Sequence, residues 1–228
     1  MTAKSCNIKH GPKLRDERVA VSIMQRSLNI AFDCDGVLFD TEAFQIKYGG
    51  KYFSKKYNMP IANENAYGIK DLFNCSDSQE IEFWIRHALR YSYLFRPRLN
   101  TAKVIRNLHK AGHKIHIVTS KARIDEKIMG RIVKFLLRTG LMRHGIFVDD
   151  IHYCSVENSA KDKSELCKRL KFDVFVEDKV ENILELSKHT KVLCMDTRNN
   201  QGCEGLNIIR VHSFDNILHE INKLLAAE

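Results

Sequence analysis

Two acidic residues stand two positions apart at the end of a short apolar run near the start of the chain. The stretch Ser27–Glu42 reads SLNIAFDCDGVLFDTE, and its apolar side chains predict a short buried strand. Side chains two apart on a strand point the same way, so we expect Asp33 and Asp35 to face one site. Gly36 allows a sharp turn directly after them. Two carboxylates held close repel each other, which indicates a bound cation or a nucleophile with an acid/base partner.

Later stretches carry polar side chains at the ends of predicted strands or early in a helix. Lys114–Thr119 (KIHIVT) alternates like a buried strand and is followed by Ser120. Phe172–Asp178 (FDVFVED) predicts another buried strand, which ends in an acidic pair and is followed by Asn182. Between these two strands, a helix predicted over Ser159–Leu170 carries lysines near its start.

These features, in this order, resemble the four motifs of the haloacid dehalogenase (HAD) superfamily, most of whose members are Mg²⁺-dependent phosphatases. The resemblance covers about residues 27–225. It implies that Asp33 is the nucleophile and that Asp35 is the acid and base. It also implies that Thr119 and Ser120 bind phosphoryl oxygens, as hydroxyl groups at the end of the second motif.

The same resemblance implies a lysine and a metal ion. The helix register favours Lys161 as the ammonium that offsets the charge of the phosphorylated carboxylate, with Lys163 as the alternative. Mg²⁺ prefers oxygen ligands in octahedral geometry and keeps several waters. The implied protein ligands are Asp33, the backbone carbonyl of Asp35, and Asp178, with Glu177 and Asn182 supporting the water shell.

The order of the predicted elements indicates an α/β fold. Alternating strands and helices predict a parallel sheet with helices on both faces, and the resemblance implies a Rossmann-like three-layer sandwich. Residues 27–42 and 99–228 are expected to form this core. Residues 43–98 look helical and follow the first strand, where the resembled family inserts a small type 1 cap. Residues 1–26 are expected to form a basic N-terminal arm.

The net charge indicates the class of partner, and the cysteines indicate the cellular compartment. The 228 residues contain 37 Lys and Arg against 28 Asp and Glu, a formal net charge of +9, which favours anionic partners. Phosphorylated small molecules and phosphoproteins fit this charge; nucleic acid is a less favoured partner because no nucleic-acid-binding motif is visible. The 7 cysteines are scattered without a CxxC pair, which favours free thiols in the cytoplasm. The sequence shows neither a membrane-spanning apolar run nor a signal-peptide pattern.

We therefore expect a Mg²⁺-dependent phosphomonoester hydrolase that forms an aspartyl-phosphate and acts on a nucleotide, a sugar phosphate or another small phosphomonoester. The stretch Met195–Gly202 (MDTRNNQG) loosely resembles a loop of 5′(3′)-deoxyribonucleotidase-like members. Two alternatives stay open: a phosphotyrosine phosphatase of the same fold, and a HAD-like module that binds phosphorylated or nucleic-acid partners without turnover. The positive charge allows the second alternative, whereas suitable residues at every catalytic position argue against it.

Overall fold

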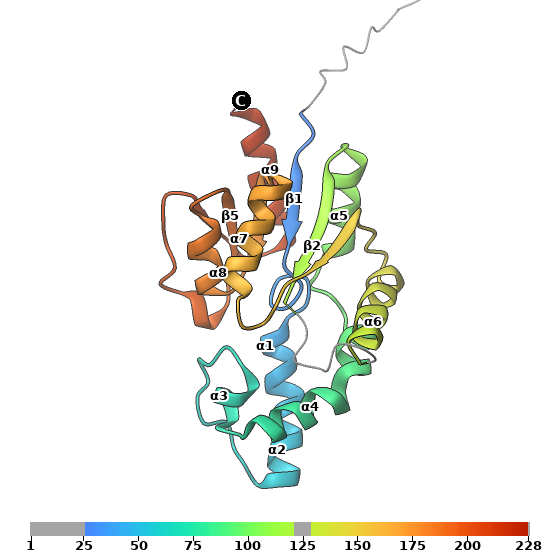
Figure 1. The fold of residues 1–228 in the computed structure, drawn as a ribbon, viewed down its shortest axis with the longest axis vertical. Coiled ribbons are helices and arrows are strands. Elements are labelled where there is room, and N and C mark those ends of the chain that lie inside the picture. Colours follow the sequence, from blue (N-terminus) through green and yellow to red (C-terminus); the bar gives the residue numbers. More distant parts are fainter. Residues whose placement is uncertain (1–25, 121–128, 228) are drawn as a thin grey trace, which may run out of the picture.

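One parallel sheet forms the centre of the fold. A computed structural model describes residues 26–120 and 129–227, and within these ranges six strands form the sheet in the order β3-β2-β1-β4-β5-β6 (Figure 1). Every neighbouring pair runs parallel, as the alternation of strands and helices predicts. The strands are β1 (Asn29–Phe32), β2 (Lys114–Thr119), β3 (Asp150–Tyr153), β4 (Val174–Glu177), β5 (Lys191–Met195) and β6 (Ile208–Val211).

Helices cover both faces of this sheet and give the three layers that were predicted. Along β1, Ile30 and Phe32 belong to one apolar core and Ala31 to the other, because side chains alternate along a strand. The helices that close the first core are α5 (Thr101–Lys110), α6 (Met129–Arg143) and α9 (Phe214–Ala226), and those that close the second are α7 (Ser159–Leu170) and α8 (Val180–Leu186).

The central position of β1 fixes where its acidic end lies. Phe32 stands opposite Ile117 of β2 and Val176 of β4 in the parallel register. Directly after Phe32, the backbone N–H of Asp33 donates to the carbonyl of Val176 at 2.9 Å. Ligands of open α/β sheets bind beyond the carboxyl ends of the strands, so Asp33 lies where a ligand-binding site is expected.

A helical insertion follows β1 and lies beyond the carboxyl ends of β1 and β2 (Figure 1). Its first helical run extends from Thr41 to Tyr57, and the middle turn of this run is a wider π-helix. The second helical run begins at a capping box between Ser76 and Gln79 and also ends in a π-helix. The elements of the insertion are α1 (Thr41–Phe44), η1 (Gln45–Gly49), α2 (Gly50–Tyr57), α3 (Ile69–Phe73), α4 (Asp77–Leu89) and η2 (Arg90–Leu94).

The N-terminal arm expected over residues 1–26 lies outside the described residues, apart from Arg26. The guanidinium of Arg26 pairs with Asp173 Oδ1 at 2.5 Å, which ties the chain before β1 to the chain before β4. In the part of the chain that the structure describes, no helix has the length and apolar character needed to cross a membrane.

Candidate active site

Asp33 follows β1 and forms a buried ion pair with a lysine of α7. Lys163 Nζ lies 2.7 Å from Asp33 Oδ1 and 2.7 Å from Glu177 Oε2. The exposed fractions of the three side chains are 2% for Lys163, 5% for Asp33 and 0% for Glu177. A buried charge is tolerated when it is paired and hydrogen-bonded, so these side chains hold one another in place.

Glu177, the last residue of β4, is fully engaged by hydrogen bonds. Its Oε1 accepts from the backbone N–H groups of Asp178 and Lys179, both at 3.1 Å. Its Oε2 accepts from Lys163 at 2.7 Å and from Asn182 Nδ2 at 3.2 Å. With two donors on each oxygen, Glu177 is an anchor for the lysine rather than a free metal ligand.

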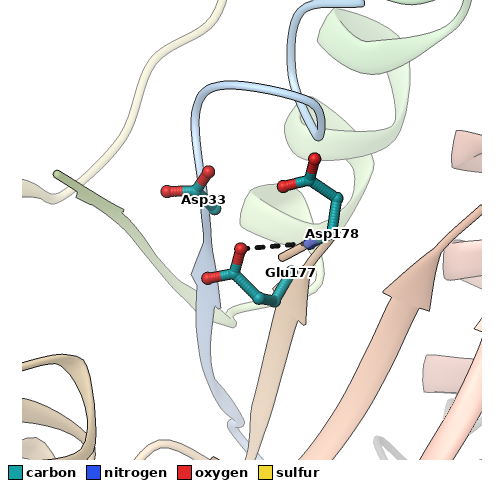
Figure 2. A group of neighbouring side chains, drawn as sticks. All are labelled: Asp33, Glu177 and Asp178. Carbon is teal, nitrogen blue, oxygen red and sulfur yellow. Dashed lines mark hydrogen bonds between the residues drawn. The ribbon is translucent and has the colours of Figure 1, made fainter. Parts of the chain in front are cut away.

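The carboxylates of Asp33, Glu177 and Asp178 converge from the ends of β1 and β4, with one oxygen of each within 4.8 Å of the others (Figure 2). Asp178 is 2% exposed, and its Oδ1 is buried without a hydrogen-bond partner among the described residues. Gly36 leaves the space that Asp178 occupies, since a Cβ at Gly36 would stand 1.9 Å from Asp178 Oδ2. The cluster thus has the oxygen donors and the negative charge that suit a divalent cation.

Burial and mutual repulsion set the charges of this cluster. Burial raises the pKa of Asp33 to about 7; Lys163 opposes this rise, while Glu177 and Asp35 add to it. Burial, followed by the charges of Glu177 and Asp33, raises the pKa of Asp178 well above its usual range. Burial by itself would lower the pKa of Lys163, but the two neighbouring carboxylates outweigh it and raise the pKa, so the lysine stays charged. A second cation in the site would relieve the remaining repulsion.

Asp35 lies in the turn after β1 and is held by the helical insertion. The hydroxyl of Tyr91, from η2, donates to Asp35 Oδ1 at 2.7 Å. The same hydroxyl lies 2.5 Å from Thr41 Oγ1, which accepts the backbone N–H of Gly36 at 2.7 Å. Gly36 has a φ of +81°, which glycine adopts readily. Both the backbone and the acidic side chain of this turn are therefore tied to the insertion.

Thr119 and Ser120 end the strand next to β1. Because Phe32 and Ile117 are in register, Thr119 lies beside the chain that follows Asp33. Thr119 Oγ1 is buried and has no hydrogen-bond partner within the described ranges, so it can donate to a ligand oxygen. Ser120 Oγ lies 2.7 Å from a serine hydroxyl at the start of α7.

The structure places Lys163, rather than Lys161, beside Asp33. Lys161 is 76% exposed, and its Nζ lies 4.0 Å from Glu165 Oε1. Two residues turn an α-helix by about 200°, so the two lysines point in nearly opposite directions. The prediction that Lys161 lies at the site is therefore wrong, and Lys163 supplies the ammonium there.

Two tyrosines of the insertion, Tyr91 and Tyr67, lie at or near the site, and neither was among the predicted site residues. The hydroxyl of Tyr91 donates to Asp35, as described above. Tyr67, in the loop before α3, has Lys179 Nζ 5.6 Å from its ring centroid, and it is 40% exposed. Burial, followed by the charges of Asp178 and Asp33, raises the pKa of its hydroxyl well above the usual range. The charges of Asp178 and Asp33 act on this hydroxyl, so Tyr67 lies near the carboxylate cluster; no motif marks either tyrosine.

One curated relative aligns over most of the chain. A nucleotidase of Clostridium acetobutylicum is 27% identical over 198 residues, which cover 86% of this chain and 95% of the relative. No family model matches the chain.

Solved structures share the architecture at low sequence identity. A predicted phosphatase from Clostridium acetobutylicum has a TM-score of 0.60 at 14% identity, over 87% of this chain and 100% of that chain. A HAD hydrolase of family IA, variant 3, from Entamoeba histolytica has a TM-score of 0.60 at 15% identity, over 87% and 99%. A predicted phosphoglycolate phosphatase from Haemophilus somnus has a TM-score of 0.58 at 16% identity, over 86% and 98%. The chain has the HAD-like fold that its motifs implied.

Proposed function

We propose that the chain is a Mg²⁺-dependent phosphomonoester hydrolase that forms an aspartyl-phosphate on Asp33. The environment of Asp33 carries this proposal: a buried carboxylate at the end of a central strand, paired at 2.7 Å with buried Lys163 and clustered with Asp178. Asp33 stands where the first motif of the resembled superfamily has its nucleophile. Solved structures of the same fold include proteins described as phosphatases.

The residues around Asp33 fit a magnesium ion. Asp178 Oδ1 is a buried oxygen without a partner among the described residues, and a buried carboxylate without compensation is costly. Asp33, the backbone carbonyl of Asp35, and Asp178 would hold the ion, while Glu177 stays bonded to Lys163. When bound, Mg²⁺ would supply positive charge that offsets the repulsion between these carboxylates and a phosphate.

Hydrolysis then proceeds in two steps on the side chains of Asp33 and Asp35. An oxygen of Asp33 attacks phosphorus, the bond from phosphorus to the leaving oxygen breaks, and Asp35 gives its proton to that oxygen. Asp35, now a carboxylate, takes a proton from water as the water oxygen attacks the phosphorus of the aspartyl-phosphate. The bond to Asp33 breaks, inorganic phosphate leaves, and both aspartates return to their starting states.

Two further side chains are placed to hold the transferring group. Lys163 takes the role first expected of Lys161, because its ammonium lies beside Asp33. Thr119 offers a buried hydroxyl that has no partner in the described part of the protein. Ser120 follows Thr119 and supports the same end of β2 through its contact with α7. Fixed donors of this kind stabilise the charge that develops on phosphoryl oxygens.

We assign residues 43–98 the role of a small cap that sets the substrate. Tyr67, which is 40% exposed, lies near the carboxylate cluster, where its ring can pack against a leaving group. The relative from Clostridium acetobutylicum is named a nucleotidase, which supports a nucleotide as the substrate class. A sugar phosphate or another small phosphomonoester is the next class to test.

The test is release of inorganic phosphate from nucleoside monophosphates, sugar phosphates, a phosphotyrosine peptide and p-nitrophenyl phosphate, in Mg²⁺ and in EDTA. Wild type should release phosphate in Mg²⁺ alone. Asp33→Asn should keep its thermal unfolding temperature and lose activity by at least about a thousandfold. Asp40→Asn is the matched control, since Asp40 is an acid of the same loop that caps α1 and pairs with Arg98.

Other outcomes would redirect or contradict the proposal. Release from the phosphotyrosine peptide alone would select the phosphoprotein phosphatase. No release from any substrate, together with salt-dependent binding of oligonucleotides, would contradict the hydrolase and support the binding module. Full activity in Asp33→Asn would remove Asp33 from the role of nucleophile.

A further inference from the structure

Tyr91 closes a ring of hydrogen bonds around the turn that carries Asp35. Its hydroxyl lies 2.7 Å from Asp35 Oδ1 and 2.5 Å from Thr41 Oγ1, and Thr41 Oγ1 lies 2.7 Å from the backbone nitrogen of Gly36. Gly36 follows Asp35 directly, so the ring returns to its starting point. A side chain of the insertion thus contacts the proposed acid and base of the reaction.

The chemistry of these groups fixes the direction of the ring. The N–H of Gly36 can only donate, so Thr41 Oγ1 accepts from it. Tyr91 has a single proton and donates it to Asp35 Oδ1, so Thr41 is the donor at its 2.5 Å contact with Tyr91; the other acceptor near Thr41 Oγ1, the carbonyl of Phe39, is farther away at 3.5 Å. The Tyr91 oxygen thus accepts a hydrogen bond from Thr41, and its own O–H donates to Asp35 Oδ1. A phenol keeps its proton at neutral pH, so this donor is present whether Asp35 is charged or neutral.

We propose that Tyr91 is a positioning residue that determines which oxygen of Asp35 carries the proton during hydrolysis. The inference rests on the proposed function, in which Asp35 is first the acid and then the base. Because Oδ1 accepts the Tyr91 proton, a proton on Asp35 is held on Oδ2, and Oδ2 gives it to the leaving oxygen. Without the Tyr91 hydroxyl, Asp35 Oδ1 loses this donor and the proton is no longer directed to Oδ2, which lowers the fraction in the productive arrangement.

Packing holds Tyr91 in this position. The side chain is 4% exposed, and its ring centroid lies 4.7 Å from that of Phe44 and 5.5 Å from that of Trp84. Tyr91 belongs to the π-helical segment η2, and such segments frequently occur at functional sites. Arg98, the last residue of the insertion, donates from Nε to the carbonyl of Gly36 at 3.1 Å, so the turn is also held from a second side.

The test compares Tyr91→Phe with wild type on two substrates that differ in their need for an acid. A nucleoside or sugar monophosphate that wild type accepts has an alkyl leaving oxygen that must be protonated, whereas p-nitrophenolate leaves unprotonated. The measured quantity is kcat/KM, which reports stabilisation of the transition state relative to free enzyme and substrate. Tyr91→Phe should lose about tenfold to a hundredfold on the alkyl phosphate and less than about threefold on p-nitrophenyl phosphate.

Tyr57→Phe is the matched control, because it removes a hydroxyl of the same insertion that bonds to Glu82 at 2.6 Å instead of to Asp35. It should leave kcat/KM unchanged on both substrates. Equal losses on both substrates in Tyr91→Phe, or no loss, would overturn the inference while the hydrolase stands. A wild type inactive on both would remove the proposed function and the inference with it.

A second variant covers the case in which Tyr91→Phe unfolds at a clearly lower temperature than wild type. Thr41→Val keeps the shape of the side chain and removes the hydroxyl that orients Tyr91. It should show the same pattern in weaker form, with kcat/KM reduced on the alkyl phosphate more than on p-nitrophenyl phosphate. Equal kcat/KM changes on the two substrates would count against Tyr91 as a positioning residue.

Discussion

Lys163 and Asp33 form an ion pair between α7 and the end of β1, with Nζ 2.7 Å from Oδ1 and exposed side-chain fractions of 2% and 5%. The two residues lie 130 positions apart in the sequence, and the same ammonium donates to Glu177. Because both carboxylates are out of water, each depends on the ammonium for compensation of its charge. The lysine therefore contributes to the stability of the fold and to the environment of the proposed nucleophile.

Replacing Lys163 by methionine should affect stability and activity together. The variant leaves two buried carboxylates without their cation, which is expected to lower the free energy of unfolding by about 3–5 kcal/mol. It also removes charge compensation for the phosphoryl group, so kcat/KM should fall by about a hundredfold or more. Urea unfolding in EDTA and phosphate release in Mg²⁺ measure the two effects.

Lys161→Met is the control for this substitution. Its ammonium is 76% exposed and lies 4.0 Å from Glu165, and exposed pairs of this kind contribute less than about 1 kcal/mol. The free energy of unfolding and kcat/KM should both stay near the wild-type values. A loss of activity at position 161 with full activity at position 163 would restore Lys161 as the site lysine.

The apolar residues of α7 distinguish the two lysines. Leu166 and Cys167 of α7 are buried against the sheet, and Lys163 lies one helical turn before them. Lys161 lies about 200° away from Lys163 around the helix. The apolar spacing of α7 therefore indicates Lys163, and the helix register that favoured Lys161 was assigned wrongly.

Gly36 and Gly112 form a matched pair for testing the space around Asp178. Both have positive φ, +81° and +89°, so alanine strains the backbone at either position by about 1–2 kcal/mol. At Gly112 the new Cβ meets no atom of the described residues within 4 Å, whereas at Gly36 it would stand 1.9 Å from Asp178 Oδ2. Gly36→Ala should therefore displace Asp178 and lower Mg²⁺-stimulated activity by at least about tenfold, while Gly112→Ala keeps it.

Two measurements separate backbone strain from displacement of Asp178. Thermal unfolding reports the strain, and magnesium titration of phosphate release reports the displacement. Both alanine variants should unfold at lower temperature than wild type, and Gly36→Ala alone should need more Mg²⁺ for half of its maximal activity. Equal magnesium responses in the two variants would show that Asp178 does not need the space beside Gly36.

His113 is expected to make the free energy of unfolding depend on pH. Its Nδ1 accepts the backbone N–H of Leu28 at 3.2 Å, and the side chain is 3% exposed. Burial lowers the pKa of His113, and the charge of Asp173 opposes this only in part. As the pH falls below about 6.5, the unfolded chain binds a proton before the folded protein does. The contribution of His113 to stability is therefore present above that pH and is lost below it, by up to about 1.4 kcal/mol per pH unit.

The free energy of unfolding, measured at several pH values between about 5 and 7.5, checks this prediction. His113→Asn retains an acceptor but cannot titrate, so its stability should fall less steeply with decreasing pH than that of wild type. His219→Asn removes an exposed histidine of α9 and should keep the wild-type slope. The same slope in all three proteins would rule out His113 as a contributor.

The sheet could be predicted because its strands are short apolar runs that end in polar residues. Strand β2 has the bounds expected for KIHIVT, and Asp33 and Asp178 meet because the carboxyl ends of parallel strands share one edge. The contact of Tyr91 could not be predicted in this way. In the sequence Tyr91 is one aromatic residue of a helix, and its hydrogen bond depends on the π-helical turn and on how the insertion folds back over Asp35.

Asp178→Asn should separate magnesium binding from the stability of the metal-free protein. Burial and the neighbouring acids raise the pKa of Asp178, which means that its charge is unfavourable in the folded protein without a metal ion. The neutral asparagine has nearly the same shape, so in EDTA the variant should unfold at the same or a higher denaturant concentration than wild type. In Mg²⁺ it should lose this advantage, because a ligand that binds only the folded state stabilises it according to its affinity.

Titration of activity and of the unfolding temperature with Mg²⁺ measures the change in affinity. Asp178→Asn should need about tenfold or more Mg²⁺ for half of the maximal effect, since outer and inner ligands of metal sites typically contribute this much. Asp196→Asn is the control, because Asp196 follows β5 at the same edge of the sheet but pairs with Arg210 at 2.7 Å. Superimposable magnesium titrations of wild type and Asp178→Asn would mean that the buried Oδ1 of Asp178 does not hold the ion, and the metal site would have to be sought elsewhere.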